Sequence, residues 1–298
     1  MKKLLTLVAF ILLLAGTGCS ARTDRAEKKD SRPVVAVSFN AMKEFTAAVG
    51  GEYINIVSLL PEGAEPHGFQ PTPEQMKKIH HARVLVVHGL GMEPWTGNVA
   101  QAADNPDLIV VEASRGIDAI PLEEEGNEQR AYDPHAWLSL KCARQEVEHI
   151  ASALEQADPA HKEIYRRNAE AYKGELEKLR QEYEEKISRL PHKEFVAGHA
   201  AFAYLCRDFG LHMNSIESVF AEGEPSARQL TRLLDYCKAH HIRTIFTESG
   251  VSPKTSLTLA REIGAQTVPV YTMETSENGK SYLERMRSNL EKIYQHLQ

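Results

Sequence analysis

The sequence predicts an α/β protein made of two lobes with mainly parallel sheets, joined by one long helix. Short apolar runs of strand length alternate with longer segments of helical periodicity in both halves of the 298-residue chain. Such alternation is typical of parallel sheets covered by helices. Between the halves, residues 138–190 have helical character almost throughout, interrupted only near Asp158-Pro159. A helix of that length is expected to pass from one lobe to the other.

The first half begins with an apolar strand pattern and a helical stretch that ends at Val49. A capping box of Thr72 and Gln75, with Pro73 at the first helical position, predicts that a second helix begins there. The expected strands of this half are residues 33–39, 53–60, 84–88 and 108–111.

The second half repeats the scheme, so a second parallel sheet is expected. Its strands are predicted at residues 195–197, 244–247 and 266–271, with a segment of mixed character at 213–219. Its helices are predicted up to Phe209 and at residues 226–240, 253–263 and 282–297. The predicted domain limits are an N-terminal lobe at 33–157, a linking helix at 158–189 and a C-terminal lobe at 190–298.

The N-terminus has the pattern of an export signal. Lys2 and Lys3 precede an apolar run at residues 4–15 that is too short to span a membrane, and small residues then lead to Cys19. Residues 1–18 are therefore predicted to be a signal peptide, with Cys19 lipidated as in a bacterial lipobox. Gly16 stands where leucine is usual, and an ordinary secretory signal with an unmodified cysteine is the alternative. Residues 19–32 are charged and serve as a flexible tether, which predicts an extracytoplasmic protein anchored to the bacterial cell membrane by its lipid.

Composition excludes several classes of protein. Loss of Lys2 and Lys3 with the signal peptide changes the formal net charge from −6 to −8, and a mildly acidic chain without a basic cluster is not expected to bind nucleic acid. The remaining cysteines, Cys142, Cys206 and Cys237, include no CxxC pair, which excludes a zinc ribbon or a thioredoxin-like site. Cys206 and Cys237 form a disulfide in one interpretation, and all three are buried thiols in the other.

Three of the 13 histidines stand in unusual surroundings. His67 lies in the loop EPHGFQPTP, where proline and glycine fix the backbone on either side. His135 follows an acidic residue and a proline in DPHAW, and His199 follows a predicted strand directly. Ligands collect at the carboxyl edge of open α/β sheets, and neutral imidazole is a good ligand for Zn²⁺. His88, at the end of a predicted strand, is a weaker candidate, and the other histidines are expected to be solvated or structural.

A fourth metal ligand is expected after the last strand of the second lobe. The segment PVYTMETSENG offers Tyr271 and Glu274. A neutral tyrosine is a poor ligand for Zn²⁺, whereas a carboxylate binds well and offsets part of the charge of the ion. Glu274 is the better candidate on this chemistry, and Tyr271 is the alternative.

Several segments of the chain resemble the motifs of a known family. The segments EPHGFQPTP, DPHAWLSL, GHAAFAYLCRDFG, FTESGVSPKT and YLERMRSNLEKIY match in order the motifs of bacterial metal-binding lipoproteins of ABC transporters, the TroA-like, cluster A-I solute-binding proteins. The resemblance extends from about residue 35 to the C-terminus. It implies two lobes bridged by a rigid helix, with one metal ion buried in the interlobe cleft. It also implies a monomer that captures a transition-metal ion outside the cell and hands it to a membrane permease.

The resemblance places His67, His135 and His199 at three ligand positions and favours Zn²⁺ as the cargo. Members specific for manganese usually carry glutamate where His199 stands, and Mn²⁺ prefers oxygen ligands. Glu274 matches a zinc-binding subgroup. The short acidic segment 122–131 replaces the long histidine-rich loop of many zinc members. A manganese-binding member of the same family is the alternative.

An enzyme and an adhesin are two other classes of function for a protein with such a site. A three-histidine zinc site is catalytic when water occupies the fourth position, but the sequence contains no HExxH and no evident general base, so no enzymatic activity is expected. Some relatives are described as adhesins, and a surface adhesin is the second alternative. Because imidazole binds metal only when deprotonated, metal affinity is expected to fall below roughly pH 6.

Overall fold

The computed structural model describes residues 30–122, 131–220, 226–248, 253–277 and 279–298. The predicted signal peptide, Cys19 and most of the tether lie outside the described residues, as does most of the acidic segment 122–131. From Arg32 onward the chain forms one compact unit. Within the described residues, none of the helices combines the length and the apolar character that crossing a membrane requires.

The first sheet is wholly parallel and has the strand order β2-β1-β3-β4. Its strands agree with the expected positions to within a few residues: β1 Val34–Val37, β2 Asn55–Ser58, β3 Val84–Val87 and β4 Ile109–Glu112. Its helices are α2 Asn40–Gly50, α3 Pro73–His80 and α4 Thr96–Ala102, and the 3-10 turn η1 Gly51–Tyr53 follows α2. The capping box of Thr72 and Gln75 is present, with Pro73 as the first residue of α3.

The second sheet repeats this topology with the order β6-β5-β7-β8, again all parallel. The strands are β5 Glu194–His199, β6 His212–Glu217, β7 Thr244–Glu248 and β8 Gln266–Val270. The segment of mixed sequence character is thus the edge strand β6. The helices are α7 Ala203–Phe209, α8 Ala227–Ala239, α9 Lys254–Ile263 and α10 Tyr282–His296. The predicted fold class of two parallel α/β lobes is confirmed.

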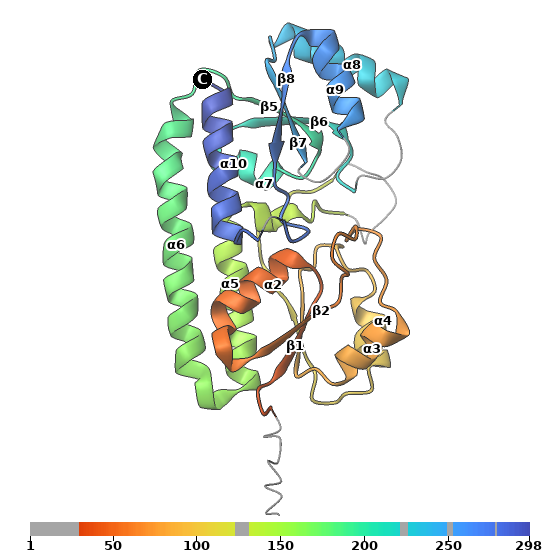
Figure 1. Ribbon diagram of the computed structural model, residues 1–298, viewed down its shortest axis with the longest axis vertical. Coiled ribbons are helices and arrows are strands. Elements are labelled where there is room, and N and C mark those ends of the chain that lie inside the picture. Colours follow the sequence, from red (N-terminus) through yellow and green to blue (C-terminus); the bar gives the residue numbers. More distant parts are fainter. Residues whose placement is uncertain (1–29, 123–130, 221–225, 249–252, 278) are drawn as a thin grey trace, which may run out of the picture. The chain divides into compact units, whose positions relative to one another are not determined.

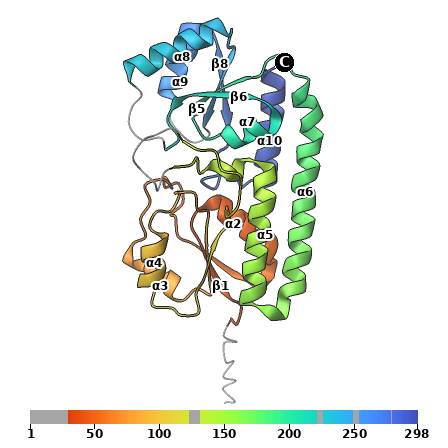
Figure 2. The same cartoon turned by 180° about the vertical axis from the view of Figure 1, so that it is seen from behind.

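The helical segment between the sheets breaks at Pro159. Helix α5 covers Leu140–Ala157, the 3-10 turn η4 covers Pro159–His161, and α6 covers Lys162–Ser188. Helix α6 packs against α5 and α2 of the first lobe and against α10 and α7 of the second (Figures 1 and 2). Helix α6 packs there because one stripe of its surface is buried at helical spacing. The stripe consists of Tyr165, Ala169, Leu176, Leu179, Tyr183 and Ile187.

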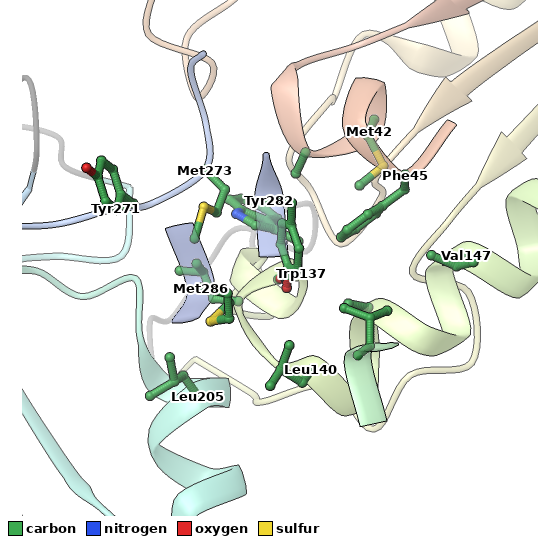
Figure 3. Close-up of a cluster of buried hydrophobic side chains, with 14 of the residues drawn as sticks. Met42, Phe45, Trp137, Leu140, Val147, Leu205, Tyr271, Met273, Tyr282 and Met286 are labelled. Atoms are coloured by element: carbon green, nitrogen blue, oxygen red, sulfur yellow. Dashed lines mark hydrogen bonds between the residues drawn. The ribbon is translucent and has the colours of Figure 1, made fainter. Parts of the chain in front are cut away.

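One hydrophobic core is common to both lobes. Phe45 and Trp137 of the first lobe belong to the same buried cluster as Tyr282 and Met286 of the second (Figure 3), and Phe39 is a further member of that cluster. The Tyr282 hydroxyl donates to the Trp137 carbonyl at 2.6 Å, and its ring meets that of Phe45 edge-on. The two sheets are therefore connected by packed side chains as well as by α6. Smaller cores on the outer faces of the two sheets belong to one lobe each.

The three cysteines of the described chain are free and buried. Cys206 lies in the shared core, whereas Cys237 lies in the outer core of the second lobe. The interpretation of three buried thiols is correct, and the Cys206–Cys237 disulfide is wrong because helices α7 and α8 carry the two residues to different cores.

Candidate metal site

Each predicted ligand sits on a loop or strand end that the fold brings to the carboxyl edge of a sheet. His67 lies on the loop after β2, where the Glu65 carboxylate accepts a 2.9 Å hydrogen bond from the His67 backbone N–H. His135 opens the 3-10 turn η3 His135–Leu138, and His199 is the last residue of β5. All three side chains are buried, as is Glu274 on the loop between β8 and α10.

The loop that carries Glu274 is held by the first lobe. The backbone N–H and the side-chain amide of Asn40, at the start of α2, donate to the carbonyls of Glu274 and Met273, both at 3.3 Å. Met273 has a positive φ of 64°, a conformation that is uncommon for residues with a side chain. The contacts with Asn40 help to hold this turn and so aim Glu274 into the cleft.

The three histidines converge on one point. One ring nitrogen from each of His67, His135 and His199 lies within 4.8 Å of the others. The Glu274 Oε1 atom lies 3.6 Å from His67 Nε2 and 3.5 Å from His135 Nε2. A tetrahedral zinc ion with bonds of about 2.0–2.1 Å keeps its ligands about 3.3 Å apart, so the carboxylate separations already fit a zinc ion, and the imidazole nitrogens would draw together by at most about 1.5 Å to bind it.

Three of the atoms at this point lack partners. His67 Nε2, His135 Nε2 and Glu274 Oε1 are buried without a hydrogen bond within the described residues. Buried polar atoms are normally satisfied, because leaving one unpaired is unfavourable by about 1–3 kcal/mol. Together with the His199 imidazole, these atoms have the donor chemistry of a Zn²⁺ site with three nitrogens and one oxygen.

Without metal, the site holds protons instead. Burial by itself lowers the pKa of His135, but the carboxylates of Asp133 and Glu274 outweigh burial and raise that pKa to about 9. Burial also lowers the pKa of His199, and Glu248 more than reverses this effect. Burial raises the pKa of Glu274, yet its interactions with His135 and His67 hold that pKa well below the usual range. An incoming cation must therefore displace protons from the imidazoles.

Two carboxylates beside the histidines have roles that the sequence motifs alone do not reveal. Asp133 Oδ1 lies 2.8 Å from His135 Nδ1, which orients the ring so that Nε2 faces the site. Glu248, the last residue of β7, places Oε1 3.2 Å from His199 Nδ1, and the Val219 carbonyl lies 2.8 Å from His199 Nε2. The signal that could have revealed Glu248 is its position at a strand end in the parallel sheet next to His199.

The two weaker candidates lie apart from the triad. The Tyr271 ring is turned away from Trp137 and Tyr282 (Figure 3) and lies near the ammonium groups of Lys280 and Lys292. His88 is fully buried against the rings of Phe39 and Trp137.

His88 Nδ1 lies 3.7 Å from Glu146 Oε1, which is also fully buried. Burial lowers the pKa of His88 to about 3 and raises that of Glu146 to about 8, so both are neutral near pH 7. His88 is therefore a structural residue behind the site.

A surface hollow of about 250 Å³ adjoins the site. It is lined by residues of the His67 loop, by the start of α2 and by the loop that carries Glu274. Glu274 is the predicted ligand that contributes to its wall. The hollow therefore leads from solvent toward the buried carboxylate.

The profile of the family described as zinc-uptake complex component A, periplasmic (ZnuA), matches residues 35–296. The chain belongs to this family. A protein described as metal-binding from Treponema pallidum (strain Nichols) is 44% identical over 96% of this chain and 94% of its own length. The high-affinity zinc uptake system protein ZnuA of Bacillus subtilis (strain 168) is 32% identical over 97% of this chain and 95% of its own.

Solved structures of the family have the same fold. The laminin-binding protein Lmb of Streptococcus agalactiae, titled a bifunctional protein with adhesin and metal transporting activity, matches with a TM-score of 0.82. It is 34% identical in sequence, and the match covers 89% of this chain and 100% of that one. The expected family and its fold of two lobes around a metal-binding cleft are thus confirmed.

Proposed function

We propose that this protein captures Zn²⁺ outside the cytoplasm and delivers it to the membrane permease of an ABC importer. The observation that carries the proposal is the convergence of three buried imidazoles and one carboxylate, of which His67 Nε2, His135 Nε2 and Glu274 Oε1 have no hydrogen bond within the described residues. His67, His135, His199 and Glu274 are the proposed ligands. Membership of a zinc-uptake family supports the same cargo.

Zinc is favoured over manganese by the donor set. Three nitrogen donors suit Zn²⁺, whereas Mn²⁺ prefers carboxylates, carbonyls and water. Glu274 contributes one negative charge, which offsets half of the charge of the ion. The laminin adhesion named for the S. agalactiae protein is a property of that protein, and the metal site of this chain gives no reason to favour it here.

We propose that the site holds its ion and does not use it for catalysis. All four ligands are at most 7% exposed, so a fourth donor from the protein fills the position that an attacking water would need. The lipid on Cys19, the position of the protein outside the cell membrane and its monomeric state belong to the same proposal. They rest on the export signal at residues 1–18 and on the transporter family.

Native mass spectrometry of the mature protein tests the metal and its ligands. In the presence of a competing chelator, the wild type is expected to retain one Zn²⁺, and the His67→Ala/His135→Ala variant none. Zinc should also raise the melting temperature of the wild type, since an ion at 100 times its dissociation constant adds about 2.7 kcal/mol to the free energy of unfolding. Equal retention by both proteins would overturn the ligand assignment. Delivery is tested by growth at limiting zinc, where cells that carry only the variant are expected not to grow.

A further inference from the structure

A second group of histidines gathers at the opposite edge of the second sheet. Parallel strands begin at one edge and end at the other, so residues that precede β5, β6 and β7 come together away from the cleft. Glu194 is the first residue of β5 and pairs in register with His212, the first residue of β6. His240 follows α8 and precedes β7.

This group is separate from the metal site in the cleft. Glu194 and His199 are the two ends of the same strand β5. At a rise of about 3.3 Å per residue, five residue steps place them about 16 Å apart. A cation held at Glu194 would therefore share no ligand with the cleft.

Glu194 is the centre of the group. Its Oε1 atom accepts a 3.0 Å hydrogen bond from His212 Nδ1 and lies 4.0 Å from His240 Nδ1. Its other oxygen accepts from the Tyr236 hydroxyl, and the Tyr236 ring stacks on that of His240 with centroids 4.2 Å apart. Tyr236 thus fixes both the carboxylate and one of the two imidazoles, which lowers the entropy lost when a ligand binds.

The surroundings of Glu194 offer imidazole ligands for a cation. Glu194 and His240 line a small hollow of about 30 Å³ together with His192, His241 and His296. Arg243 also lines this hollow, and its positive charge disfavours a cation there. The Glu194 side chain is only 19% exposed, whereas the side chains of His212 and His240 are 70% and 46% exposed. His240 Nδ1 and Glu194 Oε1 lie 4.0 Å apart, close to the roughly 3.3 Å between tetrahedral ligands, and His212, the more exposed of the two imidazoles, can rotate toward a cation held there.

We propose that Glu194, His212 and His240 form a second, surface site for a divalent transition metal that prefers imidazole, with Zn²⁺ as the cation to test. The metal displaces the proton that His212 Nδ1 donates to the carboxylate, and water completes the coordination. Because two of the ligands are exposed, this site binds more weakly than the cleft. It is independent of the proposed transport function.

Calorimetric titration of the mature protein with Zn²⁺, in a variant whose cleft is disabled by His67→Ala and His135→Ala, tests the proposal. That variant is expected to bind one Zn²⁺ still. Adding His212→Asn and His240→Asn should weaken this binding at least tenfold, and adding Glu194→Gln should do the same. His161→Asn is the matched control: His161 also pairs with a carboxylate, Asp158, at 2.7 Å, and its loss should leave the binding unchanged.

Absence of zinc binding in the cleft variant, or unchanged binding after loss of His212 and His240, would overturn the proposal. Because both histidines are exposed, their replacement should not disturb folding. An unchanged circular dichroism spectrum would show that weaker zinc binding is not caused by misfolding. Failure of this proposal differs from failure of the proposed cleft ligands. If the cleft ligands were wrong, the wild type and the cleft variant would bind the same number of zinc ions with the same affinity.

Discussion

The indole nitrogen of Trp137 donates a 2.8 Å hydrogen bond to the carbonyl oxygen of Thr272. Trp137 lies two residues after His135, and Thr272 lies two residues before Glu274. The bond thus joins the loops that carry two proposed ligands from different lobes. This bond therefore helps to couple the ligand positions on either side of the cleft, together with the contacts of Asn40 to the Glu274 loop.

Replacement of Trp137 by phenylalanine should therefore weaken both the fold and the site. The change leaves the Thr272 carbonyl buried without its partner and opens a cavity, which together should lower the free energy of unfolding by about 2–4 kcal/mol. Chemical denaturation without metal measures this, and zinc competition measures affinity. Trp95→Phe is the control, because Trp95 is equally buried and its indole nitrogen has no partner in the described structure. Equal losses in both variants would contradict a special role for the Trp137 bond.

Glu274→Gln should weaken zinc binding far more than Tyr271→Phe. The glutamine keeps the shape of the side chain but removes the negative charge next to His67 and His135. Loss of a residue that merely orients a ligand weakens metal sites by 10–100-fold, so loss of a ligand should exceed about 100-fold. The Tyr271 ring points to lysines, and its hydroxyl should be dispensable. A paired competition titration that ranked the two variants in the reverse order would make Tyr271 the ligand.

Zinc affinity should continue to rise with pH up to about 9. His135 has a pKa of about 9 in the metal-free protein, so Zn²⁺ must displace its proton at every lower pH. Each such proton makes apparent affinity change by about tenfold per pH unit. The window is thus higher than the pH of roughly 6 expected from an ordinary histidine. In Asp133→Asn, which removes the main charge that raises this pKa, affinity should level off at a lower pH. A wild-type affinity constant from pH 6.5 to 9 would refute the displaced proton.

Glu146→Gln should remove a pH-dependent part of stability. Burial raises the pKa of Glu146 to about 8, so the folded state holds a proton that the unfolded state has lost above its ordinary pKa near 4.5. The free energy of unfolding therefore falls as pH rises toward 8, by at most about 1.4 kcal/mol per pH unit. His88, with a pKa of about 3, has the opposite effect and destabilises the fold below pH 6.5.

With chelator present, the difference between the wild type and Glu146→Gln from pH 6.5 to 8 isolates the Glu146 contribution, because protonation of His88 in the unfolded state affects both proteins alike. The wild type should lose about 1–2 kcal/mol more than Glu146→Gln over this interval. Parallel pH profiles for the two proteins would mean that Glu146 is ionised in the folded state.

His199→Glu should shift metal preference away from zinc. The change replaces a nitrogen donor with an oxygen donor, which favours Mn²⁺ relative to Zn²⁺. The new carboxylate would lie beside Glu248, whose Oε1 atom is 3.2 Å from His199 Nδ1, so the loss of zinc affinity should exceed the gain for manganese. Direct competition monitored by native mass spectrometry gives the preference, and an unchanged ratio would place His199 outside the ligand set.

Much of the fold and the histidine triad could be predicted because both follow from local patterns. Apolar runs and caps locate the strands and helices, and parallel topology places His67 and His199 at the carboxyl edges of the first and the second sheet, respectively. The roles of Asp133 and Glu248 could not be predicted, because they depend on rotamers and on which strands are neighbours. The pairing of Glu194 with His212 depends likewise on the register of β5 and β6. The apolar periodicity around Trp137 and Tyr282 predicts burial but does not reveal that they share one core.

That shared core determines how long the protein keeps its ion. Packed interiors deform little, so the shared core opposes a rigid-body opening of the two lobes and keeps His135 and His199 in place. The His67 loop is different, because Pro61, Glu62 and Gly63 are exposed and border the 250 Å³ hollow beside Glu274. Release of zinc would then depend on movement of this loop more than on movement of the lobes. A permease that displaced the loop would shorten the residence time of the ion.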